Sequence, residues 1–327
     1  MSKNSTQFLT VSFSGAGHLL SYHLGVSSLL YNMSLSPKTN KNKSKTLPPI
    51  KAIAGSSSGS IAATILSRIP HRLEEFTDEF ISKRGEAISI LKSILHDEEK
   101  ILSGISSIRH SNTSINISSK ANQQRPNLYI ATTNCTDGSL HLKEFSNHAE
   151  FATISSSWDN DLLMKTILAS CTIPPSFHPL DLLPYRSYDL SYPSEEGVYI
   201  NDKSYVDGGI AAPIPPTPRN MDKRAYPVIV SPISYHSDGI EDGNSSTSSN
   251  EKRILRISPH DNSWRLLPLK NIHVGGREQH RLQVKPSVQN LRALRISAGA
   301  CSTWELRDWY NRGFSDADRL LSETFSK

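Results

Sequence analysis

Gly55-Ser56-Ser57-Ser58-Gly59 connects an apolar run at residues 50–54 with a run of helical spacing at residues 60–69. A serine at a sharp strand-to-helix turn is typical of a nucleophile elbow, in which flanking glycines leave room for the turn and the hydroxyl stays exposed. The first turn of the following helix adds N–H groups and a partial positive charge, which favour a developing anion. A Ser/Gly cluster is also typical of a plain loop, and the strand before it and the helix after it favour the elbow.

The pattern around this motif predicts one α/β domain over residues 8–323, because strands and helices alternate along the chain. Strands are expected at 8–13, 50–54, 128–133, 198–200, 205–206 and 228–230, with a turn at 201–204. Helices are expected at 19–33, 60–69, 161–169 and 303–325. Flexible polar insertions are expected near 36–48, 110–125 and 235–252.

Two further helices are expected after the elbow, each with an apolar stripe that faces the core. The stripes are Leu73, Phe76, Phe80 and Ile81 in the first helix, and Ala87, Ile88, Leu91, Ile94, Leu95 and Leu102 in the second.

The composition gives no sign of a membrane-spanning, secreted or metal-binding protein. The chain has 327 residues, 36% of them hydrophobic, and no apolar run approaches the length of a membrane span. Its first ten residues lack the apolar stretch of a signal peptide. Cys135, Cys171 and Cys301 give neither a disulfide framework nor a zinc spacing, so a cytoplasmic protein without a metal is expected. The net charge of +5 would suit an anionic surface, although a modest basic excess is usual for solubility.

A serine nucleophile needs donors for the oxyanion that forms at the attacked carbonyl. Gly15-Ala16-Gly17 is a small-residue loop between the first strand and the first helix, and such a loop can point successive N–H groups into a cleft. If the first strand lies beside the elbow strand, this loop lies next to Ser57. A dinucleotide-binding loop would need a third glycine where the chain has Leu20, and a phosphate loop of the Gly-Lys-Ser/Thr type is absent.

The base that activates Ser57 is left open by these patterns. His236, His260, His273 and His280 follow in the order that an α/β-hydrolase would use, but all lie in polar or irregular sequence. Asp207, in Val206-Asp207-Gly208-Gly209, ends a strand, and a desolvated carboxylate can also serve as a base. An Asp-Gly pair is equally typical of a hairpin turn.

Three blocks taken together resemble the patatin-like phospholipase family, most closely the branch that contains adiponutrin and adipose triglyceride lipase. They are Ser12–Gly17 continuing through Tyr22-His23-Leu24-Gly25-Val26, then Gly55–Gly59, then Asp207-Gly208-Gly209. Ala169–Pro174, Val230-Ser231-Pro232 and Gly313–Ala317 are also similar to the family. The resemblance covers almost the whole chain. It departs from the family at the last glycine of the first block, where this chain has Leu20.

The resemblance implies a three-layer α/β/α fold with a mostly parallel central sheet. It implies a serine–aspartate dyad without a catalytic histidine, in which Ser57 is the nucleophile and Asp207 the general base. The amides of Gly15, Ala16 and Gly17 would form the oxyanion hole, and the turn glycines would be Gly55, Gly59, Gly208 and Gly209.

The function implied is that of a lipid acyl hydrolase, of the triacylglycerol lipase or phospholipase A type, acting through an acyl-enzyme. An acyltransferase or transacylase on the same dyad, and a non-catalytic lipid-surface binding protein, are the alternatives. No cofactor or metal is expected. The partner would be a lipid ester at a membrane or lipid-droplet surface, and not a nucleic acid.

Overall fold

The computed structural model describes residues 7–35, 47–109, 125–146, 156–177, 191–216, 224–236, 254–259, 272–274, 282–284, 286–299 and 301–325. The three polar insertions predicted from the sequence lie largely outside these ranges. The prediction of one domain over residues 8–323 stays a prediction.

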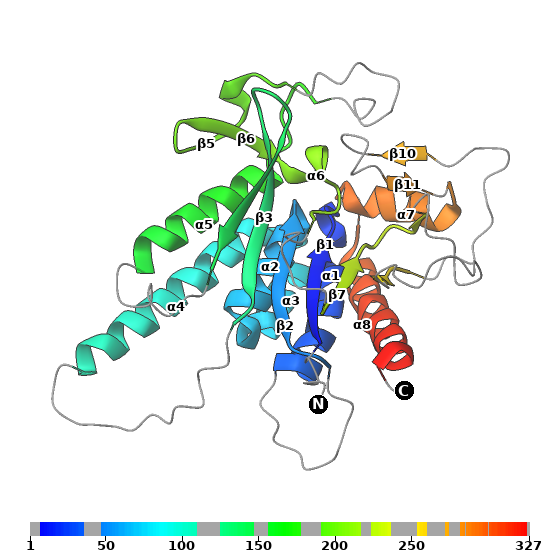
Figure 1. Cartoon of the computed structure of the whole chain (residues 1–327), viewed down its shortest axis with the longest axis horizontal. Coiled ribbons are helices and arrows are strands. Elements are labelled where there is room, and N and C mark those ends of the chain that lie inside the picture. The colour runs from blue at the N-terminus through cyan, green and yellow to red at the C-terminus, as the bar shows by residue number, and fades with distance from the viewer. Residues whose placement is uncertain are drawn as a thin grey trace, which may run out of the picture.

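A mixed eight-stranded sheet forms the centre of the described structure (Figure 1). Its strands are β1 (Phe8–Phe13), β2 (Ile50–Ser56), β3 (Asn127–Asn134), β4 (Leu140–Phe145), β5 (Val198–Ile200), β6 (Lys203–Asp207), β7 (Ala225–Val230) and β9 (Leu255–Ile257). The strands β3-β2-β1-β7-β9 are parallel neighbours, whereas β4, β5 and β6 pair antiparallel. The predicted α/β class with a mostly parallel central sheet is therefore confirmed.

The helices that the sequence pattern predicted are present among the described residues, with small shifts at their ends. The described helices are α1 (Leu20–Leu30), α2 (Ser58–Arg68), α3 (Leu73–Ser82), α4 (Ala87–Arg109), α5 (Ser156–Cys171), α6 (Gly208–Ala211), α7 (Val288–Ser297) and α8 (Thr303–Phe325). The short helix α6 and the helix α7 were not predicted. A second, three-stranded sheet was also missed, and consists of β8 (Tyr235–His236), β10 (Ile272–Val274) and β11 (Leu282–Val284).

The hairpin that leads to Asp207 is tighter than predicted. Its turn consists of Asn201 and Asp202, which both have positive φ angles, of 47° and 62°. Two such residues make the turn whose twist matches a β-hairpin, and Asn and Asp tolerate this conformation well. Lys203 and Ser204, which were predicted in the turn, therefore belong to β6.

One edge of β3 is shared by two strands. The strand β4 pairs along the opposite edge, where Thr132 faces His141. On the shared edge Ala131 pairs with Ser56, the last residue of β2, and Thr132 pairs with Asp207, the last residue of β6. Because β2 runs parallel to β3 and β6 runs antiparallel, the two strands meet end to end. The register thus brings the residue after Ser56 next to Asp207.

The core is built on rows of apolar residues that cross the sheet. One row runs through the parallel strands from Leu255 and Val228 to Val11, Ile53 and Leu128, each paired with the next. All five side chains belong to the main hydrophobic cluster. Such continuous apolar strands are expected where parallel strands are covered by helices.

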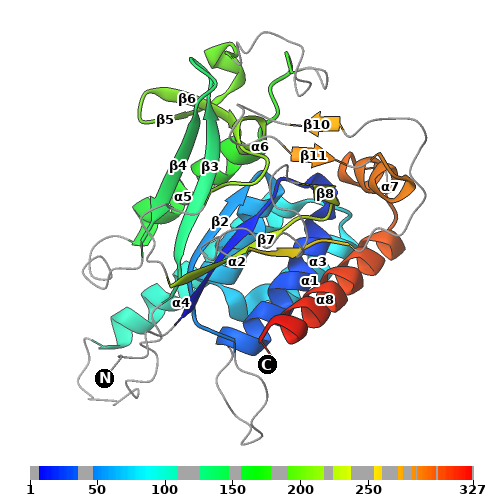
Figure 2. The ribbon, with the colours of Figure 1, turned by 45° about the vertical axis from the view of Figure 1, so that its right-hand side comes forward.

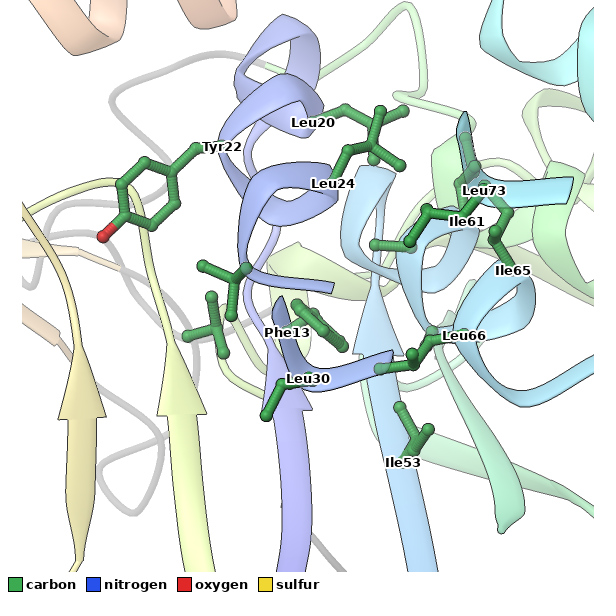
Figure 3. Close-up of a cluster of buried hydrophobic side chains, with 14 of the residues drawn as sticks. Phe13, Leu20, Tyr22, Leu24, Leu30, Ile53, Ile61, Ile65, Leu66 and Leu73 are labelled. Carbon is green, nitrogen blue, oxygen red and sulfur yellow. The ribbon is translucent and has the colours of Figure 1, made fainter. Parts of the chain in front are cut away.

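Helices α1 and α2 cover this face of the sheet. Figure 3 shows Leu20 and Leu24 of α1 on the side toward α2, where Ile61 and Ile65 lie. Almost every residue of α1 is buried, because the long helix α8 packs against its other side (Figure 2). The stripes predicted for α3 and α4 face the core wherever their side chains are described: Leu73, Phe76, Phe80, Ile81, Ala87, Leu91, Ile94 and Leu95 are buried, and Ile88 packs against the cluster. The side chain of Leu102, also predicted in the second stripe, is not among those described.

The contact between α1 and α8 is so close that it depends on glycine. A Cβ atom on Gly313 of α8 would lie 2.1 Å from the carbonyl oxygen of Tyr22. A Cβ atom on Gly25 of α1 would lie 2.0 Å from the carbonyl oxygen of Tyr310. Backbone atoms cannot yield to such overlaps, so the helices would have to separate.

The Gly313→Ala variant is therefore expected to lose stability, by about 1–3 kcal/mol or more, since overpacking forces backbone shifts of this cost. Urea unfolding followed by circular dichroism measures the change. Ser315→Ala, an exposed position on the same helix, is the matched control and should unfold at or above the wild-type urea concentration because alanine has the higher helix propensity. Equal midpoints for Gly313→Ala and the wild type would contradict the close packing.

Among the described residues, each helix is too short or too polar to cross a membrane.

Candidate active site

Ser57 occupies the sharp turn between β2 and α2, as the motif predicted. Its backbone angles, φ 50° and ψ −134°, are rare for any residue other than glycine. Its carbonyl oxygen accepts hydrogen bonds from the N–H of Ser60 at 2.9 Å and from the Ser60 hydroxyl at 2.6 Å. The first turn of α2 therefore begins directly behind the hydroxyl and holds the turn in place.

The glycines of the elbow allow backbones to approach one another. A Cβ atom on Gly55 would lie 2.2 Å from the carbonyl oxygen of Gly59. A Cβ atom on Gly59 would lie 2.4 Å from the carbonyl oxygen of Ser14, and one on Gly208 would lie 2.1 Å from that of Ala131. At Gly209 a Cβ atom would meet only the carboxylate of Asp207, at 2.9 Å. Three of the four predicted turn glycines are thus required by close packing.

Asp207 is held by its backbone on both sides. Its N–H donates to the carbonyl oxygen of Thr172 at 2.8 Å, and its carbonyl oxygen accepts the Thr133 hydroxyl at 2.7 Å. One oxygen of its carboxylate accepts the N–H of Gly209 at 2.7 Å. The side chain is therefore fixed before any substrate arrives.

The side chain of Ser57 lies close enough to the Asp207 carboxylate to lower the pKa of that carboxyl group as a hydrogen-bonding neighbour. Burial raises the pKa of Asp207 from 3.8 to about 6, because a charged carboxylate is poorly solvated there. The Ser57 side chain and the N–H of Gly209 act in the opposite direction, since they stabilise the charged form. A carboxylate with a pKa near 6 is ionised at neutral pH and still basic enough to accept a proton from a hydroxyl.

The loop Gly15-Ala16-Gly17 lies beside the elbow, as predicted. A Cβ atom on Gly15 would be 3.2 Å from the Cβ atom of Ser57. The N–H of Gly15, however, donates to the carbonyl oxygen of Pro213 at 3.0 Å, and the N–H of Ala16 donates to the Ser58 hydroxyl at 3.1 Å. Of the three predicted donors, Gly17 alone has an N–H without a partner among the described residues. The position of Gly17 permits glycine only, since its φ is 52° and a Cβ atom would lie 2.1 Å from the Ser297 carbonyl oxygen.

A buried histidine supports this loop and was not singled out by the sequence. The ring of His23 is fully buried, and its Nε2 lies 2.9 Å from the carbonyl oxygen of Ser14. Burial lowers the pKa of His23 to about 4, so the ring is neutral at physiological pH and Nε2–H donates to that carbonyl. Its position in the block Tyr22-His23-Leu24-Gly25-Val26 was the signal that could have found it.

The four histidines considered as alternative bases fall outside what the structure describes in detail. His260 and His280 lie outside the described residues. His236 and His273 lie in β8 and β10 of the small sheet, and their side chains are not among those described. Within the described part of the chain, there is no cluster of His, Cys, Asp and Glu side chains that could hold a metal ion.

The thiol of Cys171 is the other potential nucleophile near Asp207. Its Sγ atom lies 3.9 Å from the Ser60 hydroxyl. Burial, and next the charge of Asp207, raise the pKa of Cys171 far above its usual range. The thiol therefore stays protonated, and a protonated thiol is a weak nucleophile.

The family model of patatin-like phospholipases matches residues 11–218, a range that contains the N-terminal loop, the elbow and Asp207. The chain belongs to the patatin-like phospholipase family. The resemblance predicted from the motifs is thus confirmed, and membership agrees with the α/β/α fold and supports a lipid hydrolase.

A human relative is the patatin-like phospholipase domain-containing protein 4, which is 27% identical over 237 residues, 70% of this chain and 74% of that protein. Among solved structures, VipD from Legionella pneumophila aligns with 97% of this chain and 67% of its own, at 11% identity and a TM-score of 0.35.

The raised pKa of Asp207 predicts a pH-dependent cost to stability. The pKa of Asp207 is higher in the folded than in the unfolded chain, so the folded state binds the carboxyl proton more tightly. The resulting stabilisation of the folded state is complete below about pH 4 and is lost as the pH rises through about 6. Asp207→Asn removes the charge, so its stability relative to the wild type should increase by up to about 3 kcal/mol between pH 4 and pH 7.5.

Urea unfolding of both proteins at the two pH values measures this difference. Asp318→Asn, which changes an exposed carboxylate on α8, shows the background expected from a surface charge. A difference between Asp207→Asn and the wild type that does not change with pH would mean that the Asp207 carboxylate is well solvated.

Proposed function

We propose that the protein is a lipid acyl hydrolase in which Ser57 is the nucleophile and Asp207 is the general base. The observation that carries the proposal is the strand register that brings Ser57, on an elbow that opens a helix, next to the buried carboxylate of Asp207. A serine hydroxyl is a weak nucleophile at neutral pH unless a base accepts its proton. Membership of the patatin-like phospholipase family supports a lipid ester as the substrate.

In the first half of the reaction, the Ser57 oxygen attacks the ester carbonyl carbon while its proton moves to the Asp207 carboxylate. The oxyanion that forms is stabilised by backbone N–H groups, for which we propose Gly17 and the first residue of α2, Ser58. When the oxyanion collapses, the alcohol departs with the proton from Asp207, and the acyl group remains on Ser57.

In the second half, water attacks the acyl-enzyme and gives its proton to Asp207. The fatty acid leaves, and the proton returns to the Ser57 oxygen. Every proton transfer uses the one carboxylate, so the chemistry requires no cofactor or metal. An alcohol that replaces water in this step would give transacylation, which product analysis with a lysolipid acceptor distinguishes from hydrolysis.

The N–H groups of Gly15 and Ala16 differ in how readily they could bind the oxyanion. The N–H of Ala16 becomes available to an oxyanion when the Ser58 side chain changes its χ1 rotamer and moves its oxygen away. The N–H of Gly15 is fixed on the backbone carbonyl of Pro213, so we assign it to holding the loop.

Exposed apolar side chains lie on two sides of the site and would suit an acyl chain or a lipid surface. Ile173, which is 62% exposed, follows Thr172, the residue that binds the Asp207 N–H. On the other side, Val288, Leu291 and Leu294 are exposed on α7. The same helix ends at Ser297, whose carbonyl would be 2.1 Å from a Cβ atom on Gly17. We propose that a lipid surface approaches the site from here.

Ser57→Ala and Asp207→Asn are expected to remove ester hydrolysis. Loss of the general base should lower kcat by roughly 10²–10⁴-fold, and loss of the nucleophile should end acyl-enzyme formation. The measurements are hydrolysis of p-nitrophenyl butyrate and fatty-acid release from trioleoylglycerol emulsions and phosphatidylcholine vesicles. Asp202→Asn, in the turn of the same hairpin, should keep full activity because asparagine tolerates its positive φ.

Labelling with a fluorophosphonate, followed by peptide mapping, tests the nucleophile without the natural substrate. Modification of Ser57 in the wild type supports the proposal. Full activity in a folded Asp207→Asn variant would overturn the dyad, and lipid binding without labelling or turnover would favour a non-catalytic lipid-surface protein.

The pH dependence of kcat/KM is expected to follow the ionisation of Asp207. Activity should be constant above about pH 7 and fall tenfold per unit below about pH 6, because the protonated carboxylate cannot accept the serine proton. Rates with p-nitrophenyl butyrate between pH 4.5 and 8, corrected with Ser57→Ala, show the midpoint. A midpoint that shifts in a histidine variant would identify a histidine base instead.

A further inference from the structure

Ser170, at the end of α5, connects the nucleophile elbow to the central sheet. Its side chain is fully buried. The hydroxyl accepts the N–H of Ser57 at 2.9 Å and donates to the carbonyl oxygen of Ala131 at 2.7 Å. Both hydrogen-bonding functions of the hydroxyl are thus used, one by the nucleophile's own backbone and the other by the strand β3.

Two residues further on, the same segment holds the general base. The carbonyl oxygen of Thr172 accepts the N–H of Asp207 at 2.8 Å. The two members of the proposed dyad are 150 residues apart in the chain. Their backbone N–H groups nevertheless donate to acceptors in one short segment, the Ser170 hydroxyl and the Thr172 carbonyl oxygen. The end of α5 fixes the spacing between the Ser57 hydroxyl and the Asp207 carboxylate.

The Ser57 N–H requires this partner for a physical reason. Ser57 precedes the first residue of α2, and at φ 50° its backbone is in a strained conformation that must be held by its surroundings. Removing the acceptor would leave a polar group in a partly buried place without a partner, which the turn can relieve by changing its angles. Such a change moves the hydroxyl relative to the carboxylate, and a displacement of about 1 Å in a reacting group can cost about 10²-fold in rate.

We infer that Ser170 is a positioning residue for the hydrolysis, which acts by holding the Ser57 backbone in its reactive conformation while Thr172 holds that of Asp207. The inference rests on the proposed function for its effect on the rate. Ser170 itself is buried behind the elbow and does not meet the substrate, so its loss should act on kcat rather than on KM.

The test compares Ser170→Thr with Ser170→Val, which have the same shape and differ in the hydroxyl alone, together with Ser170→Ala. Ser67→Ala is the matched control, because Ser67 is a buried serine of α2 whose hydroxyl donates to the Pro126 carbonyl oxygen at 2.9 Å. Thermal unfolding, kcat and KM for p-nitrophenyl butyrate, and the rate of fluorophosphonate labelling are measured for each variant.

Ser170→Val and Ser170→Ala are expected to lose at least about tenfold in kcat and in labelling rate, with KM unchanged and the acid limb still near pH 6. Ser170→Thr should regain most of this loss. Ser67→Ala should lose thermal stability and keep its kcat, which separates positioning from general destabilisation. Equal kcat values for folded Ser170→Val and Ser170→Thr would overturn the inference.

Amide hydrogen exchange of the peptide that contains residues 55–60 provides a readout that does not depend on activity. Protection should be lost in Ser170→Val and kept in Ser170→Thr, and equal protection in the two variants would overturn the inference. If the wild type neither labels nor hydrolyses esters, the proposed function is wrong, and the exchange result still decides whether Ser170 holds the Ser57 backbone.

Discussion

The site depends on the sharing of one edge of β3 by two strands that run in opposite directions. Because β4 occupies the other edge, β2 and β6 meet end to end, with Ser56 opposite Ala131 and Asp207 opposite Thr132. Hydrogen-bond registry between strands is fixed to a single residue, since a slip by one residue would turn every side chain to the other face. The register of the sheet therefore brings Ser57 and Asp207 together, and the end of α5 holds the backbone of both residues.

Side-chain hydroxyl groups form hydrogen bonds to the buried backbone N–H and C=O groups near the ends of β2 and β6. Ser170 serves Ser57 and Ala131, while Thr133 accepts the N–H of Ala211 and donates to the carbonyl of Asp207. An unpaired buried N–H or C=O group costs about 1–3 kcal/mol. These small side chains remove that cost in little volume, whereas the Asp207 carboxylate is buried and its pKa is raised.

Much of the fold could be predicted from the sequence because most elements have clear periodicity. The strand Phe8–Phe13 and the helix Thr303–Phe325 were predicted with the bounds that the structure has. The strand β4 was missed because it lies on an edge and buries only Phe145 fully, so it lacks an apolar run. The small sheet was missed because its strands have two or three residues each, which is too short for a period to show.

The sequence by itself determined the elbow, the glycine loop and the aspartate motif, because each is a local backbone requirement written in consecutive residues. It also determined the family, since three such motifs in a fixed order are far more specific than one. Only the tertiary structure decided which groups meet: that Asp207 contacts Ser57, that the Gly15 N–H is bound to Pro213, and that Ser170 holds the elbow. Those contacts join residues that are more than 100 positions apart. They are set by strand register and burial, which are properties of the folded chain.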